Sequence, residues 1–305
     1  MEFVKRACKC VVFIGGKTEM GQFIPYGTGF LISKFTDDSF EIQFDYVVTC
    51  VHVVDIAESK IWIRVNLIDG GSEIIETLKD SWFLNRDNDI AILSRYFSND
   101  TFDVARIIEQ DFVTNDVLIR MEVEPGDETF TVGLFTSHEG FIRNMPIVRM
   151  GNIAAIPKEK VLIDIGYREA YLVESRSIGG LSGSPVFLLL GAGIRGEPES
   201  SVGSFLLGMM QGRLNTTDAN DVVGGDSITD TINTGIGVVI PVDIIRDTIN
   251  HPHLIAQRED TVKKLKKESH YRPCATSPSN QENPQHKEDF NSLVSAATKK
   301  KPRDD

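Results

Sequence analysis

The chain reads GGLSGSPVF from Gly179 to Phe187, and the rest of the sequence is organised around this stretch. Three glycines and a proline surround Ser182, and an apolar run begins at Pro185. Glycine permits backbone conformations and close approaches that a Cβ would block. A serine on such a turn exposes its hydroxyl beside free backbone N–H groups. This arrangement suits an acyl-transfer nucleophile with an oxyanion pocket of main-chain donors, and the alternative is a plain hairpin loop.

A serine nucleophile needs a base, and only one of the six histidines follows a strongly apolar strand. This is His52, in the stretch from Tyr46 to Val54. The others are His138, His251, His253, His270 and His286, which lie in polar segments or in and beyond the last predicted helix. A histidine between valines is often a core residue, but its ring exchanges a proton near neutral pH. His52 is therefore the candidate base.

Asp89 is the candidate for the acid that orients this base. It opens the apolar strand Asp89 to Leu93, and a carboxylate there must be hydrogen-bonded or paired. An imidazole N–H is a suitable partner, because that contact fixes the tautomer and leaves the other nitrogen free to accept a proton. Asp87 lies nearby in more polar surroundings and is the weaker candidate.

Short apolar runs broken by turn residues extend to about residue 260, which predicts an all-β sandwich or barrel. Two sets of strands are expected around a polar connection at 97–115, and they predict two barrels of similar size. The strands are expected at 8–14, 27–33, 40–48, 61–68 and 89–93, then at 117–122, 129–134, 148–156, 170–174, 185–190, 204–211 and 235–240. A surface loop is expected at 214–233.

The end of the chain is predicted to be a helix followed by a polar tail. Val242, Ile245 and Ile249 share one helical face, and Pro252 is expected to end the helix. Few apolar residues follow, which predicts a disordered tail that is either simply solvated or docks a partner protein. The predicted domains are residues 1–110, 111–257 and this tail at 258–305.

Composition excludes several classes of function. The 305 residues are 41% hydrophobic and 25% charged, as in a soluble globular protein. A formal net charge of −12 disfavours binding to nucleic acid, which depends largely on basic groups. No apolar run approaches the roughly 18 residues of a membrane span, and the N-terminal apolar segment is too short and mixed for a secretory signal. A cytoplasmic protein without membrane contact is expected.

Cysteine spacing predicts free thiols. Cys8, Cys10, Cys50 and Cys274 suit neither a dense disulfide framework nor a metal site. We therefore expect no disulfide, no bound metal and no cofactor, and free thiols agree weakly with a reducing location.

The ordered motifs resemble those of the chymotrypsin-like (trypsin-like) serine peptidases. They are GTGFLI from Gly27, VTCVHV from Val48, DIAIL from Asp89 and the loop from Gly180 to Pro185. Histidine, aspartate and serine follow in the order of that family. The chain looks most like the disulfide-free bacterial branch, which includes HtrA-type and staphylococcal glutamyl-type enzymes, and the resemblance covers roughly residues 10 to 250.

This resemblance implies two six-stranded antiparallel β-barrels with a catalytic triad in the cleft between them. Ser182 would be the nucleophile, His52 the general base and then acid, and Asp89 the orienting carboxylate. The backbone N–H groups of Gly180 and Ser182 would form the oxyanion hole. Ser184 is the competing serine, but it stands closer to the following strand. The implied substrate is a protein or peptide.

The resemblance also places a specificity pocket around the nucleophile. Its walls would include Arg176, Ser177, Ile178, Met210, Gln211 and Gly212. No acid stands where trypsin itself carries one, and Met210 falls about where the glutamyl-specific branch has a histidine. Arg176 and Arg213 either attract an acidic side chain or are ordinary surface arginines.

Two functions follow from these residues. The leading one is a serine endopeptidase, because every residue type of the triad is present. The alternative is a catalytically silent or signal-gated peptide-binding module on a peptidase fold.

Overall fold

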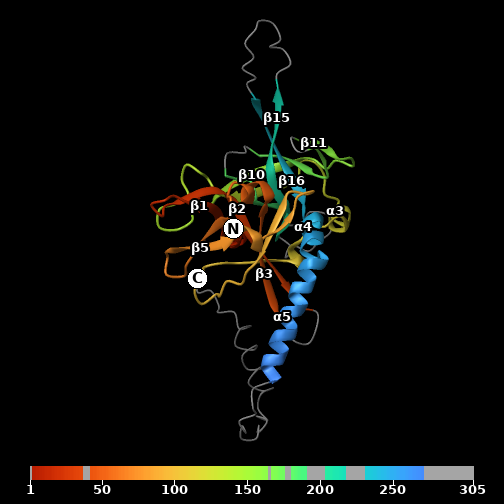
Figure 1. Ribbon diagram of the computed structural model, residues 1–305. Coiled ribbons are helices and arrows are strands. Elements are labelled where there is room, and N and C mark those ends of the chain that lie inside the picture. The colour runs from red at the N-terminus through yellow and green to blue at the C-terminus, as the bar shows by residue number, and fades with distance from the viewer. Residues whose placement is uncertain are drawn as a thin grey trace, which may run out of the picture. The chain divides into compact units, whose positions relative to one another are not determined.

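The computed structural model describes residues 2–36, 42–163, 166–175, 180–190, 203–217 and 231–270 (Figure 1). The chain separates into two units, Met1–Glu259 and Asp260–Asp305. The first unit carries all the strands that the structure describes. The second is described only through His270, as the C-terminal part of a helix, α5 (Pro252–His270).

The first half of the chain forms an eight-stranded sheet, here called the N-terminal sheet. Its strands are β1 (Val11–Lys17), β2 (Phe23–Phe35), β3 (Gln43–Cys50), β4 (Lys60–Asn66), β5 (Ser72–Leu78), β6 (Phe83–Asn85), β7 (Ile90–Ser94) and β8 (Ile107–Ile108). They run in the order β5-β4-β1-β2-β3-β7-β6, and β8 pairs in parallel with β2. The apolar pattern predicts five of these strands and does not reveal β5, β6 and β8, and the resemblance implies a six-stranded barrel where the structure has eight strands.

The second half forms a closed barrel of six antiparallel strands, here called the C-terminal barrel. Its strands are β9 (Glu128–Gly133), β10 (Ile147–Ala155), β13 (Tyr171–Glu174), β14 (Pro185–Leu190), β15 (Gly203–Thr217) and β16 (Thr231–Pro241). They close in the order β10-β13-β16-β15-β14-β9. A separate hairpin pairs β11 (Val161–Ile163) with β12 (Gly166–Arg168). The predicted all-β class, with a six-stranded C-terminal barrel, is confirmed.

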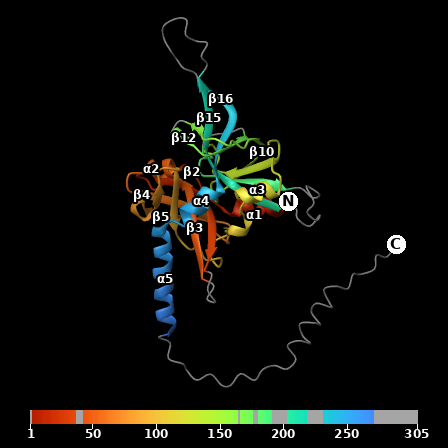
Figure 2. The same ribbon diagram turned by 90° about the vertical axis from the view of Figure 1, so that its right-hand side faces the viewer.

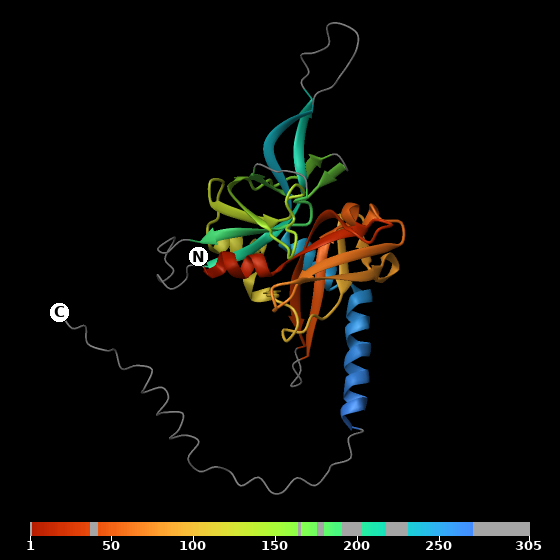
Figure 3. The same ribbon diagram turned by 90° about the vertical axis from the view of Figure 1, so that its left-hand side faces the viewer.

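Helices cover the ends of these sheets. They are α1 (Glu2–Lys9), α2 (Val51–Asp55), α3 (Asn115–Arg120) and α4 (Val242–Ile249), with short 3₁₀ turns η1 (Lys79–Ser81) and η2 (Glu109–Asp111). Figure 3 shows α1 against the C-terminal barrel, where the ring of Phe3 lies 6.1 Å from that of Phe130. Figure 2 shows α4 in front of the strands, and the backbone N–H of Asn115 at the start of α3 donates to Asp243 of α4.

Three predicted elements differ in the structure. The segment expected as strand 117–122 is mainly helix α3, because Val117, Leu118 and Met121 follow helical spacing and pack on the barrel core. The strand expected from Cys8 is preceded by helix α1 and begins at Val11. The predicted loop at 214–233 contributes residues to both β15 and β16, and its centre lies outside the described residues.

The helix at the C-terminus also differs. α4 ends at Ile249, before Pro252, but Pro252 then opens α5, which reaches His270. Proline is well suited to the first turn of a helix, because its missing N–H has no partner there in any case. Residues 258–270 are therefore helical, where the sequence predicts a disordered tail.

In the described part of the chain, no helix is long and apolar enough to cross a membrane. Cys8, Cys10 and Cys50 are free thiols, and Cys274 lies outside the described residues.

A buried ion pair ties the connection between the two halves to the N-terminal sheet. Nε of Arg106 donates to Oδ2 of Asp45 at 2.9 Å, and the two side chains are 8% and 0% exposed. Ser33 and Gln43 also donate to Oδ1 of Asp45. Such a pair is tolerable because its hydrogen bonds are satisfied, and removing one member leaves an uncompensated charge.

We therefore expect Arg106→Met to lower the free energy of unfolding by about 3–5 kcal/mol. The exposed pair between Lys60 and Glu76 provides the control, and Lys60→Met should cost about 1 kcal/mol or less. Urea denaturation of both variants measures the difference. Equal stabilities would show that the Arg106 pair contributes no more than a surface contact.

Candidate active site

His52 lies at the end of strand β3 of the N-terminal sheet, in the short helix α2 that follows it. Val51, Val53 and Val54 of this helix are buried against the core, so His52 is turned outward. Its side chain is 48% exposed. The valines that make His52 resemble a core residue in the sequence therefore anchor the helix and leave the imidazole accessible.

Asp89 is brought to His52 by the pairing of β7 with β3. The register places Ile90 opposite Cys50, so that Asp89 stands beside Val51, whose N–H donates to the Asp89 carbonyl. Asp89 has a φ of 56°, in the left-handed region, which aspartate tolerates better than most residues. The backbone N–H of His52 donates to Oδ1 at 3.0 Å, and Nδ1 of His52 lies 2.7 Å from Oδ2.

Asp89 is a carboxylate held ionised in a buried place. Burial raises its pKa, but the hydrogen bonds and charge of His52, together with a hydrogen bond from Gln211, outweigh burial and leave the pKa below its usual range. An ionised carboxylate at Nδ1 favours the tautomer with the proton on that nitrogen. Nε2 of His52 is then left as the proton acceptor.

Ser182 sits on a turn that is fixed against both halves of the molecule. Its carbonyl accepts a hydrogen bond from the Thr28 N–H at 2.9 Å, and the Gly183 N–H donates to the Met210 carbonyl at 2.8 Å. Gly183 has a φ of 83°, and a Cβ there would lie 2.0 Å from the Thr28 carbonyl oxygen. Only glycine fits this position, so the glycine after the serine is a structural requirement of the turn.

Gln211 of β15 connects the serine to the acid. The Ser182 hydroxyl donates to the Gln211 carbonyl at 3.0 Å, and the Gln211 side-chain amide donates to Oδ2 of Asp89 at 3.0 Å. Within the described chain, no hydrogen bond joins Ser182 to His52. The structure thus links the three predicted residues through Gln211 and the His52–Asp89 contact, with the Ser182 hydroxyl directed to the Gln211 carbonyl.

The backbone N–H groups predicted for the oxyanion hole belong to Gly180 and Ser182. In the described ranges, neither Gly180 nor Ser182 donates a hydrogen bond from its N–H. Gly180 has a φ of 98°, and its carbonyl accepts the Thr28 hydroxyl at 2.8 Å. The turn is thus anchored through carbonyl groups while these two donors stay available for an anionic oxygen.

The residues predicted for the specificity pocket divide into three groups. Arg176, Ser177 and Ile178 lie outside the described residues. Gly212 is partly exposed, with open space where a side chain would project. The Met210 side chain, predicted beside the substrate, is fully buried in the core of the C-terminal barrel because its register on β15 turns it inward.

Ser184 and Asp87, the alternative candidates for the nucleophile and the acid, lie outside this cluster. The Ser184 hydroxyl is inaccessible to a substrate because it is fully buried, and it has no hydrogen-bond partner among the described residues. Asp87 is exposed on the turn between β6 and β7. Sequence reasoning did not anticipate that the Gln211 side chain contacts Asp89, because 122 residues separate the two.

Cys50, His52 and Asp89 place one potential ligand atom each within 4.8 Å of one another. Burial, followed by the charge of Asp89, raises the pKa of the Cys50 thiol well above its usual value. Its sulfur donates to the Met210 carbonyl at 3.6 Å. A protonated thiol is a poor metal ligand, so this group suits the histidine–carboxylate pair better than a metal site.

A sheet that carries His52 and Asp89, followed by a closed barrel that carries Ser182, defines the architecture of this chain. The fold is chymotrypsin-like. It agrees with the fold that the sequence motifs predict.

Similar proteins were found by comparison of the fold with solved structures. The chain is 15% identical to the MamO protease domain from Magnetospirillum magneticum in its apo form, over 80% of this chain and 97% of that one, with a TM-score of 0.48. It is 15% identical to the Rv3671c protease in its inactive form, over 82% and 91% of the two chains, with a TM-score of 0.45. A serine-to-alanine mutant of Rv3671c from M. tuberculosis gives 14% identity over 81% and 88%, with a TM-score of 0.45. No protein-family model and no curated protein matches the sequence.

Gln211→Met tests the contact between Gln211 and Asp89. Loss of the amide donor should raise the pKa of Asp89 toward its usual value, because one of the bonds that stabilise the carboxylate is gone. The stability that comes from a lowered pKa is present above the unfolded value of about 3.9 and is lost as the pH falls through the folded pKa. In Gln211→Met the loss of stability should therefore be smaller and should be complete at a higher pH than in the native chain.

Carbon-13 NMR titration of the Asp89 carboxyl measures this pKa directly, with the exposed Gln22→Met as the control. An Asp89 titration that is identical in both variants would show that the Gln211 amide does not stabilise the carboxylate.

Proposed function

We propose that the chain is a serine endopeptidase that hydrolyses peptide bonds through an acyl-enzyme on Ser182. The observation that carries this proposal is the 2.7 Å contact between Nδ1 of the exposed His52 and the buried Asp89 carboxylate. An imidazole held in this way presents Nε2 to solvent as a base. Ser182 is connected to the same carboxylate through Gln211, and of the two serines in the described stretch 180–190 it is the one that is not fully buried.

The first chemical step needs one rearrangement of the serine. Its hydroxyl must leave the Gln211 carbonyl and donate to Nε2 of His52. Catalytic hydrogen bonds in enzymes without substrate are often loose and tighten in the complex. The oxygen then attacks the substrate carbonyl while His52 takes the proton, and Asp89 remains ionised and stabilises the imidazolium.

The free N–H groups of Gly180 and Ser182 receive the negative charge that develops on the carbonyl oxygen. A missing donor of this kind typically costs on the order of 3 kcal/mol in the barrier. His52 next gives its proton to the leaving amine, which breaks the peptide bond. Water, activated by the same imidazole, hydrolyses the ester on Ser182 and restores the enzyme.

A second candidate function is a peptide-binding module that does not turn its ligand over. The hydrogen bond from the Ser182 hydroxyl to the Gln211 carbonyl favours it, because a serine held there is not activated. The two functions differ in a measurable way. A binding module would hold peptides with the same affinity and no cleavage, whether position 182 is serine or alanine.

Asp89→Asn tests the proposed peptidase. An asparagine in place of the carboxylate would hold the imidazole in the wrong tautomer, and turnover of a peptide substrate should fall by roughly four orders of magnitude. The loss should shrink at high pH, where hydroxide can replace the missing base.

Asp87→Asn is the matched control, because Asp87 is exposed on the same turn. Turnover is measured against pH for both variants, with a melting curve to check folding. If Asp87→Asn were the slow variant, the acid would be misassigned. If neither variant lost activity, the triad would not operate.

A further inference from the structure

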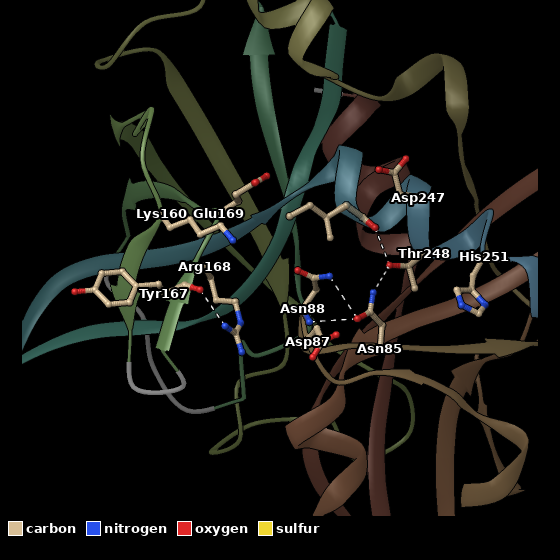
Figure 4. A pocket seen from close by; sticks show the side chains of 11 residues that line it. Asn85, Asp87, Asn88, Lys160, Tyr167, Arg168, Glu169, Asp247, Thr248 and His251 are labelled. Carbon is tan, nitrogen blue, oxygen red and sulfur yellow. Dashed lines mark hydrogen bonds between the residues drawn. The ribbon is translucent and has the colours of Figure 1, made fainter.

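A polar cavity of about 480 Å³ lies apart from the site described above. It is bounded by the hairpin β11–β12 and the segment before it, by the turn between β6 and β7, and by α4 with the residues that follow (Figure 4). Neither His52, Ser182 nor Gln211 lines it. A volume of this size is typical of ligand sites, which range from about 300 to 1,000 Å³.

One wall of this cavity presents two cations that lack a carboxylate partner. Figure 4 shows Lys160 and Arg168 together on the hairpin side. Nη1 of Arg168 donates to its neighbour, the Tyr167 carbonyl, and its Nε is buried without a hydrogen-bond partner. No ion pair forms at Lys160 or Arg168 within the described ranges. A buried guanidinium N–H without an acceptor is costly, so an acceptor placed beside Arg168 would be stabilising.

The opposite wall is a turn that is held rigidly in place. The Asn85 amide donates to the Thr248 hydroxyl of α4 at 2.9 Å, and the Asn88 N–H donates to Oδ1 of Asn85 at 3.3 Å. Asp87 projects from this same turn but does not pair with either cation across the cavity. Among the described residues, no hydrogen bond or ion pair crosses the cavity from this turn to Lys160 or Arg168, which leaves the space between them open to a ligand.

The charges around the cavity select the kind of anion. Asp87, Glu169 and Asp247 also line it. These three carboxylates repel any anion, but they repel a doubly charged phosphate more strongly than a singly charged carboxylate. The planar guanidinium of Arg168 also matches the geometry of a carboxylate, which it can bind through two parallel hydrogen bonds.

We propose that this cavity is a second binding site, which takes a singly charged carboxylate through Arg168 and Lys160. The carboxylate belongs either to an acidic side chain of a peptide or to a small free acid. The site goes beyond the proposed peptidase chemistry and does not require it. The turn that forms its far wall leads directly to Asp89, so an occupant would sit two residues from the proposed orienting acid.

The test is a binding measurement by titration calorimetry on the full chain carrying Ser182→Ala, so that no peptide is cleaved. The probes are a blocked tripeptide with a central glutamate, the same peptide with glutamine, butyrate as a small free acid, and inorganic phosphate. Arg168→Gln and Lys160→Gln remove the two cations separately. Lys158→Gln is the matched control, because Lys158 is an exposed lysine two residues from Lys160 that does not line the cavity.

We expect the glutamyl peptide to bind saturably and the glutaminyl peptide not to bind. Arg168→Gln and Lys160→Gln should each weaken binding by about tenfold or more, the usual effect of losing a charge-assisted hydrogen bond, and Lys158→Gln should not. Butyrate binding as tightly as the peptide would identify a small acid as the ligand, and weaker butyrate binding would identify a peptide.

Three results would overturn the site. They are no saturable binding of any carboxylate, equal affinity in the Arg168→Gln, Lys160→Gln and Lys158→Gln proteins, and tighter binding of phosphate than of the carboxylates. Because Ser182→Ala is inactive under the proposed mechanism, these results are independent of whether the chain is a peptidase.

Discussion

The contact between His52 and Asp89 is the interaction on which the candidate site depends. A carboxylate in so buried a place is stable only because three donors meet it, namely the His52 backbone, the His52 ring and the Gln211 amide. Each donor comes from a different constraint of the fold. The start of α2 places the His52 backbone N–H, and the outward face of α2 places the His52 ring. The register of β15 places the Gln211 amide. The buried acid thus couples the N-terminal sheet to the C-terminal barrel.

The serine turn is held by the same kind of coupling. Thr28 of β2 donates through both its N–H and its hydroxyl to carbonyl groups of the turn, at Ser182 and Gly180. Its own carbonyl approaches Gly183 so closely that no side chain fits there. The proposed nucleophile and base therefore lie on separate halves of the molecule, and β2 fixes the position of the Ser182 turn. Preorganisation of this kind is what a reaction at a fixed carbonyl requires.

Local patterns in the sequence predict the candidate residues and most strands, but they do not predict contacts between segments that are far apart in the chain. His52, Asp89 and Ser182 could be singled out as candidates because each interrupts an apolar or glycine-rich pattern, and the structure links them through Gln211. Helix α3 was misassigned because a short apolar segment satisfies both helical and strand spacing, and the barrel core decides between them. Met210 looks like a pocket residue by position, but the pleat of β15 turns it inward. The contact between Gln211 and Asp89, and the cavity beside Arg168, arise only when segments far apart in the sequence meet.

The central claim is that His52 activates Ser182. The most direct measurement is intact-mass analysis after exposure to a fluorophosphonate, which reacts with an activated serine and needs no knowledge of the natural substrate. The account predicts one adduct on the native chain, none on Ser182→Ala, and labelling that is greatly slowed on His52→Ala. An adduct that forms equally on all three proteins would contradict the assignment of the nucleophile. A native chain that takes up no label would show that the Ser182 hydroxyl stays on the Gln211 carbonyl and that the chain is not a serine peptidase.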